Sequence, residues 1–339
     1  MAAFQADGKI IGVVGATGAV GAEMVNVLSR RNFPVQKLVL FASKRSAGKI
    51  ISTPYGDSTV EEFSVEAARE MDIVFLAVSG SFALQYARDI AAPGGAVVID
   101  NSSAFRYMPE FPLCIPEVNP EVAKGNTLIA NPNCTTAIAA VALWPLHQKY
   151  KLKKVIVSSY QASSGAGAEG MEELKVGARQ VLEGNPCPSK VFSHPLAFNV
   201  LPHIDKFQEN GYTKEEMKVA WETTKVFGVE PGSIKVSVTA VRVPTLRAHA
   251  EAITIETEEK ISPDEARELL RGCPGVQVID NPEKMEYPMP LNASEKFDVE
   301  VGRIRRSLVF EDFGIDLFVC GDQLLKGAAL NAVQIAEVL

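Results

Sequence analysis

The feature that most constrains the fold is a glycine-rich turn near the start of the chain. Residues 9–15 read KIIGVVG, the pattern of a buried strand, and ATGAVGAEM follows with apolar residues at helical spacing. Gly15, Gly18 and Gly21 therefore lie between a strand and a helix. Glycines there permit a tight turn and let a phosphate approach the N–H groups of a helix N-terminus. A turn without a ligand is the alternative, but the strand–turn–helix context favours a dinucleotide site.

The pattern of elements changes near residue 133. Before it, apolar strands alternate with helices, which predicts a parallel sheet covered on both faces. After it, the strands are longer and more alternating, which predicts a mixed or antiparallel sheet. The strands expected in the first part are 9–15, 37–43, 72–79 and 95–103, with a helix over 81–91. Those expected in the second part are strands 153–161, 234–245, 248–257, 305–312 and 314–322, and helices 134–150, 167–182, 213–226, 263–271 and 322–339.

Composition narrows the class of protein. With 339 residues the chain is longer than one hydrophobic core usually supports, so two domains are expected. The net charge of −7, without a long basic block, argues against a nucleic-acid or membrane-surface protein. Five scattered cysteines without a C-x-x-C pair predict neither a disulfide framework nor a metal site. The N-terminal residues lack a signal pattern, so we expect a cytoplasmic protein, with a plastid precursor that has lost its transit peptide as the alternative.

The end of the second predicted strand indicates which dinucleotide is bound. An NAD-specific site places Asp or Glu there to hold the ribose 2′-hydroxyl. This chain instead has Ser43, Lys44, Arg45 and Ser46, whose hydroxyls and cations suit a 2′-phosphate. An ordinary solvated basic loop is the alternative. The position of the segment favours NADP.

Cys134 is the candidate nucleophile. It follows Asn133 in NPNCTT and begins the helix expected over 134–150, and a helix N-terminus stabilises a thiolate. A buried, unreactive cysteine is an equal alternative from local sequence. A thiolate needs a proton-handling partner, and His249, close to Arg242 and Arg247, is the best placed of the four histidines. A lone strand histidine is more often structural.

Eight motifs together make the chain similar to the aspartate-semialdehyde dehydrogenase family. They are GATGAVG, SKRSAGK, DNSSAFR, NPNCTT, SSYQASSGAG, EEMK, RVPTLRAHAE and GDQLLKGAA, in the family's order over nearly the whole length. The resemblance implies an α/β fold: an N-terminal Rossmann-type NADP-binding domain and an α+β catalytic and dimerisation domain of the glyceraldehyde-3-phosphate dehydrogenase-like kind. The first would span residues 1–133, completed by a C-terminal helix at 322–339, and the second residues 134–321.

The resemblance also implies roles for individual residues. Cys134 would form a thioacyl intermediate, His249 would be a general acid/base, and Gln161 would orient the intermediate. Implied substrate-binding residues are Arg106, Asn133, Glu215, Lys218 and Arg242. Implied cofactor-binding residues are Gly15, Thr17, Gly18, Ala19, Val20, Ser43, Lys44, Arg45, Ser46, Ser164, Gly165 and Gln323. Each has an ordinary alternative; Glu215 and Lys218, for example, could be a helix-surface ion pair.

The expected reaction is the NADPH-dependent conversion of L-aspartyl 4-phosphate to L-aspartate 4-semialdehyde and phosphate. In the family's pathway it precedes lysine, threonine, methionine, isoleucine and diaminopimelate. The alternatives are an N-acetyl-gamma-glutamyl-phosphate reductase and a non-catalytic NADP-binding protein of the same fold. We expect a small-molecule substrate, no metal, no nucleic-acid or membrane partner, and a homodimer, with a tetramer as the alternative.

Overall fold

The computed structural model describes residues 2–339 and divides them into two compact units. The first unit contains the chain up to Asn133 together with Ala328–Leu339, and the second contains Cys134–Gly327. Each unit has its own sheet and its own buried apolar residues. The chain thus leaves the first unit directly before Cys134 and returns to it near its C-terminus.

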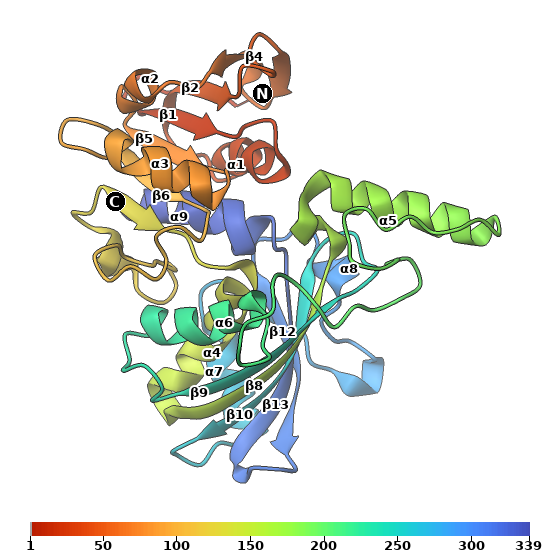
Figure 1. Ribbon diagram of the computed structural model, residues 1–339. Coiled ribbons are helices and arrows are strands. Elements are labelled where there is room, and N and C mark those ends of the chain that lie inside the picture. The colour runs from red at the N-terminus through yellow and green to blue at the C-terminus, as the bar shows by residue number, and fades with distance from the viewer. Residues whose placement is uncertain (1) are drawn as a thin grey trace. The chain divides into compact units, whose positions relative to one another are not determined.

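The first unit is built on a seven-stranded sheet in the order β3-β4-β2-β1-β5-β6-β7 (Figure 1). All neighbouring strands are parallel except β3 and β4. The strands are β1 (Lys9–Val14), β2 (Val35–Ala42), β3 (Ile50–Thr53), β4 (Gly56–Glu62), β5 (Ile73–Leu76), β6 (Val97–Asp100) and β7 (Leu128–Ala130). The helices are α1 (Ala19–Arg30), α2 (Val65–Arg69), α3 (Gly80–Ile90) and α9 (Leu330–Glu337), with a short 3-10 helix at Pro120–Ala123. The expected α/β architecture is confirmed, because continuous apolar strands such as β5 are buried on both faces.

The C-terminal segment completes this unit. Helix α9 packs against α1 and β6. Arg31 forms a two-pronged ion pair with Glu337, with N–O distances of 2.5 and 2.6 Å. The buried Asn331 amide donates to the Cys114 carbonyl at 2.9 Å and to the Asn131 side chain at 2.6 Å. The return of the chain is therefore fixed by polar as well as apolar contacts.

The helix expected over residues 322–339 differs from the observed one. It consists of a π-helical turn, Leu325–Ala329, followed by α9. The Asp322 carboxylate accepts hydrogen bonds from the N–H groups of Leu324 and Leu325, at 2.9 and 3.3 Å. This side chain caps the first turn, so the regular helix starts later than the apolar spacing predicts.

The second unit has a six-stranded mixed sheet in the order β11-β12-β13-β10-β8-β9. The pairs β11–β12 and β8–β9 are parallel, and the other pairs are antiparallel, as expected. The strands are β8 (Leu152–Gln161), β9 (Lys235–Arg242), β10 (His249–Thr257), β11 (Val276–Val278), β12 (Val299–Ser307) and β13 (Glu311–Gly321). The helices are α4 (Cys134–Tyr150), α5 (Gly167–Leu182), α6 (Lys214–Val226), α7 (Pro263–Arg271) and α8 (Pro290–Ala293), with 3-10 turns at Ser163–Ala166 and Pro282–Lys284.

One face of this sheet is covered by α4, α6 and α7, with α4 in contact with both other helices. Helix α4 is buried on all sides from Thr135 to Leu143, as expected of a helix enclosed between a sheet and two helices, whereas Gln148 and Lys149 near its end are exposed. The opposite face carries half-exposed apolar side chains on its central strands. Ile156 on β8 is 46% exposed and Tyr160 is 38% exposed, and Tyr160 contacts Phe318 of β13.

The prediction of a single strand over residues 305–312 is wrong. β12 ends at Ser307, a turn follows, and β13 begins at Glu311. Leu308 in that turn is 93% exposed. The apolar run Leu308–Phe310 resembled a strand, but all three residues form the hairpin turn, in which Leu308 and Val309 are exposed.

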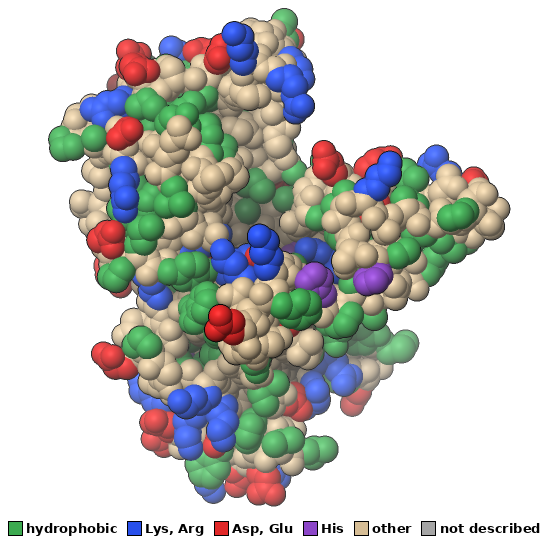
Figure 2. All heavy atoms as spheres, viewed as in Figure 1, with side chains coloured by type: hydrophobic (Ala, Val, Ile, Leu, Met, Phe, Trp, Pro, Cys, Tyr) green, Lys and Arg blue, Asp and Glu red, His purple; other side chains and the backbone are tan. Residues whose placement is uncertain are grey.

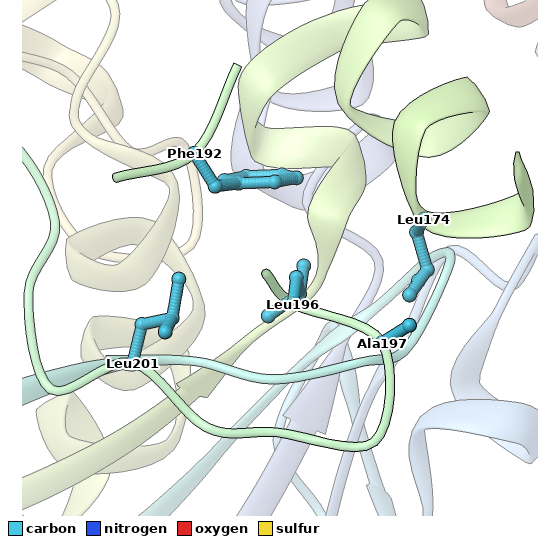
Figure 3. Close-up of a cluster of buried hydrophobic side chains, with 5 residues drawn as sticks. All are labelled: Leu174, Phe192, Leu196, Ala197 and Leu201. Atoms are coloured by element: carbon cyan, nitrogen blue, oxygen red, sulfur yellow. The ribbon is translucent and has the colours of Figure 1, made fainter. Parts of the chain in front are cut away.

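Helix α5 is anchored by a small apolar cluster (Figure 3). Leu174 of α5 meets side chains from the segment after the helix. The cluster consists of Leu174, Phe192, Leu196, Ala197 and Leu201. This segment forms no helix or extended strand, so apolar packing and the backbone hydrogen bonds between Leu201 and Arg242 fix its path beside β9.

Charged side chains of both signs are interspersed over the face shown in Figure 2. Among the described residues, 2–339, no helix is both long enough and apolar enough to span a membrane.

Candidate active site

Cys134 is the first residue of α4 and is partly buried. On one side, the backbone of Gly327 packs directly against Cys134. A Cβ atom at residue 327 would lie 2.6 Å from the Cys134 Cβ and 3.3 Å from the Gln323 Cβ. The glycine in GDQLLKGAA therefore allows the chain to pass against the cysteine. The start of a helix favours the thiolate form of a cysteine.

His249 and Gln161 occupy one end of the sheet of the second unit. His249 begins β10 and Gln161 ends the antiparallel β8, so the two side chains come together. Their Nε2 atoms lie 3.4 Å apart, and the backbone N–H of Ala162 donates to His249 Nδ1 at 3.0 Å. Burial, and next the charge of Arg242, lower the pKa of His249 to about 3, against weaker opposing effects of Glu215 and a backbone hydrogen bond at Ala248. The imidazole is therefore neutral at physiological pH.

The Gln161 amide is oriented by two partners. Ser159 Oγ donates to Gln161 Oε1 at 3.0 Å, and Gln161 Nε2 donates to Glu215 Oε1 at 3.2 Å. The reversed amide would bring two oxygens together at Glu215. The amide N–H₂ group is thus held on the side of His249.

Glu215 and Lys218 form an ion pair at 2.9 Å on helix α6. The Lys218 ammonium also contacts Asp205 at 2.8 Å. Burial alone would lower the pKa of Lys218, but the two carboxylates outweigh it and the pKa is raised. Glu215 is buried and Lys218 is partly buried, unlike an ordinary helix-surface pair, and Glu215 also contacts Gln161. This supports the functional alternative over the surface one.

Arg242, the last residue of β9, is buried beside this group. Its Nη1 donates to the Ala162 carbonyl at 2.6 Å, and its guanidinium lies 5.7 Å from the centre of the Phe192 ring. Burial lowers its pKa, while the charges of Glu215 and Cys134 oppose that effect. A Cβ at Gly165 would lie 2.6 Å from Arg242 Nη1, so this glycine leaves room for the guanidinium.

The sequence did not indicate what supports Arg242. Leu201 exchanges two backbone hydrogen bonds with it, at 2.8 and 2.9 Å, and Phe192 packs against its guanidinium. Both belong to the apolar cluster of Figure 3. Their spacing from Arg242 in the sequence is irregular, so no local pattern could have identified them.

Gln323 lies in the second unit, and its side chain forms hydrogen bonds to Ala248, just before β10, and to Ser164, in the turn after β8. Its Oε1 accepts from the Ala248 N–H at 2.8 Å, and its Nε2 donates to Ser164 Oγ. Ala248 is fully buried with φ +66°, a conformation that is uncommon for a residue with a side chain. Next to it, Arg247 Nε donates to Asp322 Oδ2 at 2.6 Å. Asp322 and Gln323 thus hold the bend that places His249.

Ser164 and Gly165 also lie in the second unit, and the remaining predicted cofactor residues belong to the first unit. Gly15 has φ +85°, and Gly18 precedes α1 without a side-chain cap, so the helix start is accessible to a phosphate. A cavity of about 420 Å³ lies at the carboxyl ends of β1, β2 and β5, beside the point where the strand order reverses. It is lined by Val14, Gly15, Thr17, Ala42, Ser43, Lys44, Glu62, Phe63, Val78, Ser79 and Phe82.

These residues fit an NADP molecule. Lys44 and Arg45 are exposed in the turn after β2, and the turn is closed by a hydrogen bond from the Ser46 N–H to the Ser43 carbonyl at 2.8 Å. Ser79, which was not identified from the sequence, caps α3 at the carboxyl end of β5. The sequence analysis placed Ser79 at the end of the expected strand 72–79, whereas β5 ends at Leu76. Ala19 and Val20 begin α1 itself.

Arg106 and Asn133 also belong to the first unit. Both are buried, and Arg106 donates to the Asn101 carbonyl at 2.8 Å. The second unit therefore assembles Cys134, Gln161, Glu215, Lys218, Arg242 and His249 within itself. Within residues 2–339 there is no group of three or more His, Cys, Asp or Glu side chains arranged to hold a metal ion.

Comparisons with known proteins agree with this division. Residues 10–126 match the family model described as semialdehyde dehydrogenase, NAD binding domain, and residues 143–326 match semialdehyde dehydrogenase, dimerisation domain. The chain is 49% identical to an aspartate-semialdehyde dehydrogenase of Aquifex aeolicus, over 98% of both chains. It is 44% identical to that of a Synechocystis strain, over 97% of this chain and 96% of the relative.

Solved structures give the same result. Aspartate semialdehyde dehydrogenase II of Vibrio cholerae, complexed with ASA, matches with a TM-score of 0.93 at 39% identity, over 98% of both chains. The enzyme of Candida albicans, solved with NADP, matches with a TM-score of 0.76 at 25% identity, again over 98% of both chains. With a nucleotide-binding unit and a second unit that holds Cys134, Gln161, Arg242 and His249, the chain belongs to the aspartate-semialdehyde dehydrogenase family.

Proposed function

We propose that the chain catalyses the NADPH-dependent reduction of L-aspartyl 4-phosphate to L-aspartate 4-semialdehyde with release of phosphate, the step expected from the sequence. The observation that carries this proposal is the cluster around Cys134. A cysteine at a helix start shares its unit with a neutral imidazole, an oriented amide, a buried guanidinium and a buried Glu–Lys pair. Family membership, with relatives of this name covering nearly the full length, supports the same reaction.

Each group has a chemical task in this proposal. The Cys134 thiolate attacks the acyl carbon, and phosphate leaves to give a thioester. Arg242 holds the substrate α-carboxylate, for which a planar guanidinium suits two-pronged binding. Glu215 accepts hydrogen bonds from the substrate ammonium group. The bound cofactor supplies the hydride that reduces the thioester.

Phosphate recognition and cofactor choice belong to the same proposal. Lys218 and Arg106 are the cations assigned to the substrate phosphoryl group, and Asn133 is the neighbouring amide. Lys44 and Arg45, with Ser43 and Ser46, bind the 2′-phosphate of NADP. Thr17, Ala19 and Val20 stand at the helix start that receives the pyrophosphate.

The proposed assembly is a homodimer formed through the second unit. Two observations support it: the match to a dimerisation domain over residues 143–326, and the half-exposed apolar side chains on the open face of the sheet. Light scattering should give twice the chain mass of 36.6 kDa, and four times that mass would indicate a tetramer. The proposed location is the cytoplasm, which the five free thiols support.

The reverse reaction provides the test. Purified protein with L-aspartate 4-semialdehyde should reduce NADP only when phosphate is added. In the Cys134→Ser variant the rate of this reaction should be at least about a thousandfold lower, because an alcohol at this position is not ionised at neutral pH. A preference for N-acetylglutamate semialdehyde would favour the alternative reductase. NADP binding without turnover on either aldehyde would favour the non-catalytic alternative.

A further inference from the structure

Asp205 lies in the loop between α5 and α6 and forms an ion pair with Lys218. Its backbone has φ +68°, in the left-handed region that Asp and Asn occupy more often than most other residues with a side chain. Oδ1 accepts from the Lys206 N–H at 2.8 Å, and Oδ2 accepts from Lys218 Nζ at 2.8 Å. One oxygen thus holds the carboxylate in place, and the other is directed at the ammonium group.

The ammonium group of Lys218 has three N–H donors in tetrahedral directions. Glu215 Oε2 accepts from one of them at 2.9 Å, and Asp205 Oδ2 accepts from another at 2.8 Å. The third donor has no partner among residues 2–339, and the Lys218 side chain remains 13% exposed. Two acceptors fix the rotation of the ammonium group, so they also fix the direction of its third N–H.

The two partners of Lys218 differ in what the proposed reaction requires of them. Glu215 is assigned to the substrate ammonium group, so its oxygens must serve that group as well as Gln161 and Lys218. Asp205 has no assigned contact with the substrate. It can therefore keep Lys218 in place while Glu215 changes partners.

The loop that carries Asp205 is attached to the rest of the site at both ends. Leu201, labelled in Figure 3, exchanges two backbone hydrogen bonds with Arg242. The Lys214 N–H, at the start of α6, donates to the Lys206 carbonyl at 2.7 Å. Burial acts to raise the pKa of Asp205, but hydrogen bonds and nearby lysine charges outweigh it, and the pKa is lowered. The carboxylate is therefore ionised at neutral pH and held in a fixed place.

We propose that Asp205 is a positioning residue that holds the Lys218 ammonium group in the orientation in which its third N–H binds the phosphoryl group of the substrate. This rests on the proposed function and adds to it a residue that contacts Lys218 and not the substrate. A negative charge so close to a phosphate would by itself weaken phosphate binding. Positioning strengthens it, so the sign of the change in phosphate affinity separates the two effects.

Calorimetric titration of inorganic phosphate into the NADP-saturated protein measures this affinity without any aldehyde. Asp205→Gly removes the carboxylate and suits the positive φ. We expect it to raise the Kd for phosphate at least about tenfold, as for one lost charge-assisted hydrogen bond. Asp205→Asn keeps an oxygen acceptor and tolerates the same backbone conformation, so its Kd should lie between those of the parent and the Gly variant.

Glu209→Gln is the matched control, because it removes an exposed charge from the same loop, and it should leave the Kd for phosphate unchanged. Unchanged or tighter phosphate binding by Asp205→Gly would overturn the proposal, the second result showing that Asp205 acts through repulsion. A parent protein that does not bind phosphate would overturn it as well.

Steady-state kinetics of the reverse reaction distinguish positioning from a general disturbance of α6. In Asp205→Gly the KM for phosphate should rise with the Kd, whereas the KM for aspartate semialdehyde should change less than about threefold. An equal rise in both constants would show that the helix has moved and would contradict the proposal. A parent protein that binds phosphate but does not oxidise the aldehyde would contradict the proposed function alone, because the calorimetric comparison needs no turnover.

Discussion

At the scale of single residues, Gly327 is the position at which the smallest change should affect the chemistry. An added methyl group would lie 2.6 Å from the Cys134 Cβ and 3.1 Å from its Cα. The nearest of these are atoms that cannot rotate away, so the chain must shift. We expect Gly327→Ala to lower kcat at least about tenfold and to destabilise the protein by about 1–3 kcal/mol.

Gly272→Ala is the matched control. Gly272 follows α7 with φ −90°, and the nearest atom to a methyl group added there would be a carbonyl oxygen at 3.9 Å. It should leave kcat unchanged. Stopped-flow assays and urea unfolding measure both effects. A Gly327→Ala protein as active as the Gly272→Ala protein would contradict the close approach to Cys134.

Glu251 is a second residue whose environment makes a specific prediction. It is fully buried, and among residues 2–339 neither of its carboxyl oxygens has a hydrogen-bond partner. Burial raises its pKa well above the usual 4.5, so the native protein keeps a proton that the unfolded chain releases above that pH. The contribution of Glu251 to the free energy of unfolding therefore falls progressively as pH rises from about 4.5 towards the native pKa.

Glu251→Gln has nearly the same shape and no proton to release. Its gain in unfolding free energy over the parent should be small near pH 5 and larger near pH 8, by at most about 1.4 kcal/mol per pH unit. Glu256→Gln, on the same strand, should behave oppositely. Hydrogen bonding and charge from Lys154 and Lys153 lower the pKa of Glu256, so its contribution is present at high pH and lost on acidification. Urea unfolding at fixed protein concentration measures both; a pH-independent gain in Glu251→Gln would disprove the buried protonated acid.

At the scale of elements, helix α6 presents Glu215 and Lys218, and Glu216 fixes its position. Glu216 Oε2 accepts from the Thr213 N–H at 2.6 Å, completing a capping box, and Oε1 accepts from the Ala240 N–H of β9 at 2.9 Å. One carboxylate thus caps the helix and attaches it to the strand that ends in Arg242.

Glu216→Gln should disturb both the stability and the site. An amide has only one oxygen, so one of the two backbone N–H groups would face a donor, at a cost of about 1–3 kcal/mol. The KM for aspartate semialdehyde should rise, because Glu215 and Lys218 lie on the same helix. Glu209→Gln, at an exposed position in the preceding loop, is the control. Thermal unfolding and steady-state kinetics decide; equal behaviour of the two variants would show that Glu216 is not needed to place α6.

The elements also show what the sequence can predict. Helices α5, α6 and α7 occupy the expected ranges within one residue, since apolar spacing and caps such as Thr213 and Ser262 are local signals. The expected strand 305–312 failed because apolar residues in a hairpin turn share the composition of a buried strand. The support of Arg242 by Phe192 could not be predicted, because it depends on how a segment without regular structure packs in three dimensions.

At the scale of the whole molecule, most of the residues proposed to bind the nucleotide lie in the first unit, and the residues proposed for thioester chemistry lie in the second. The glycine turn and the Lys44–Arg45 segment belong to the first unit, and Cys134, Gln161 and His249 belong to the second. Variants confined to one unit should therefore separate cofactor affinity from chemistry. Only the single crossing between Asn133 and Cys134 and the return at Gly327–Ala328 connect the two units along the chain.

The double variant Lys44→Ala, Arg45→Ala should raise the Kd for NADP at least about tenfold, because charge-assisted bonds to the 2′-phosphate contribute roughly 1.5–3 kcal/mol. NAD affinity should change little, since NAD lacks that phosphate. Lys37→Ala, which removes an exposed lysine earlier on β2, controls for lost charge. Cys134→Ser should behave in the opposite way: calorimetry should find NADP binding intact while turnover is absent.

The double variant can also contradict the proposed cofactor choice. Equal loss of NADP and NAD binding would show that Lys44 and Arg45 do not bind the 2′-phosphate. The preference for NADP would then depend on other residues lining the cavity.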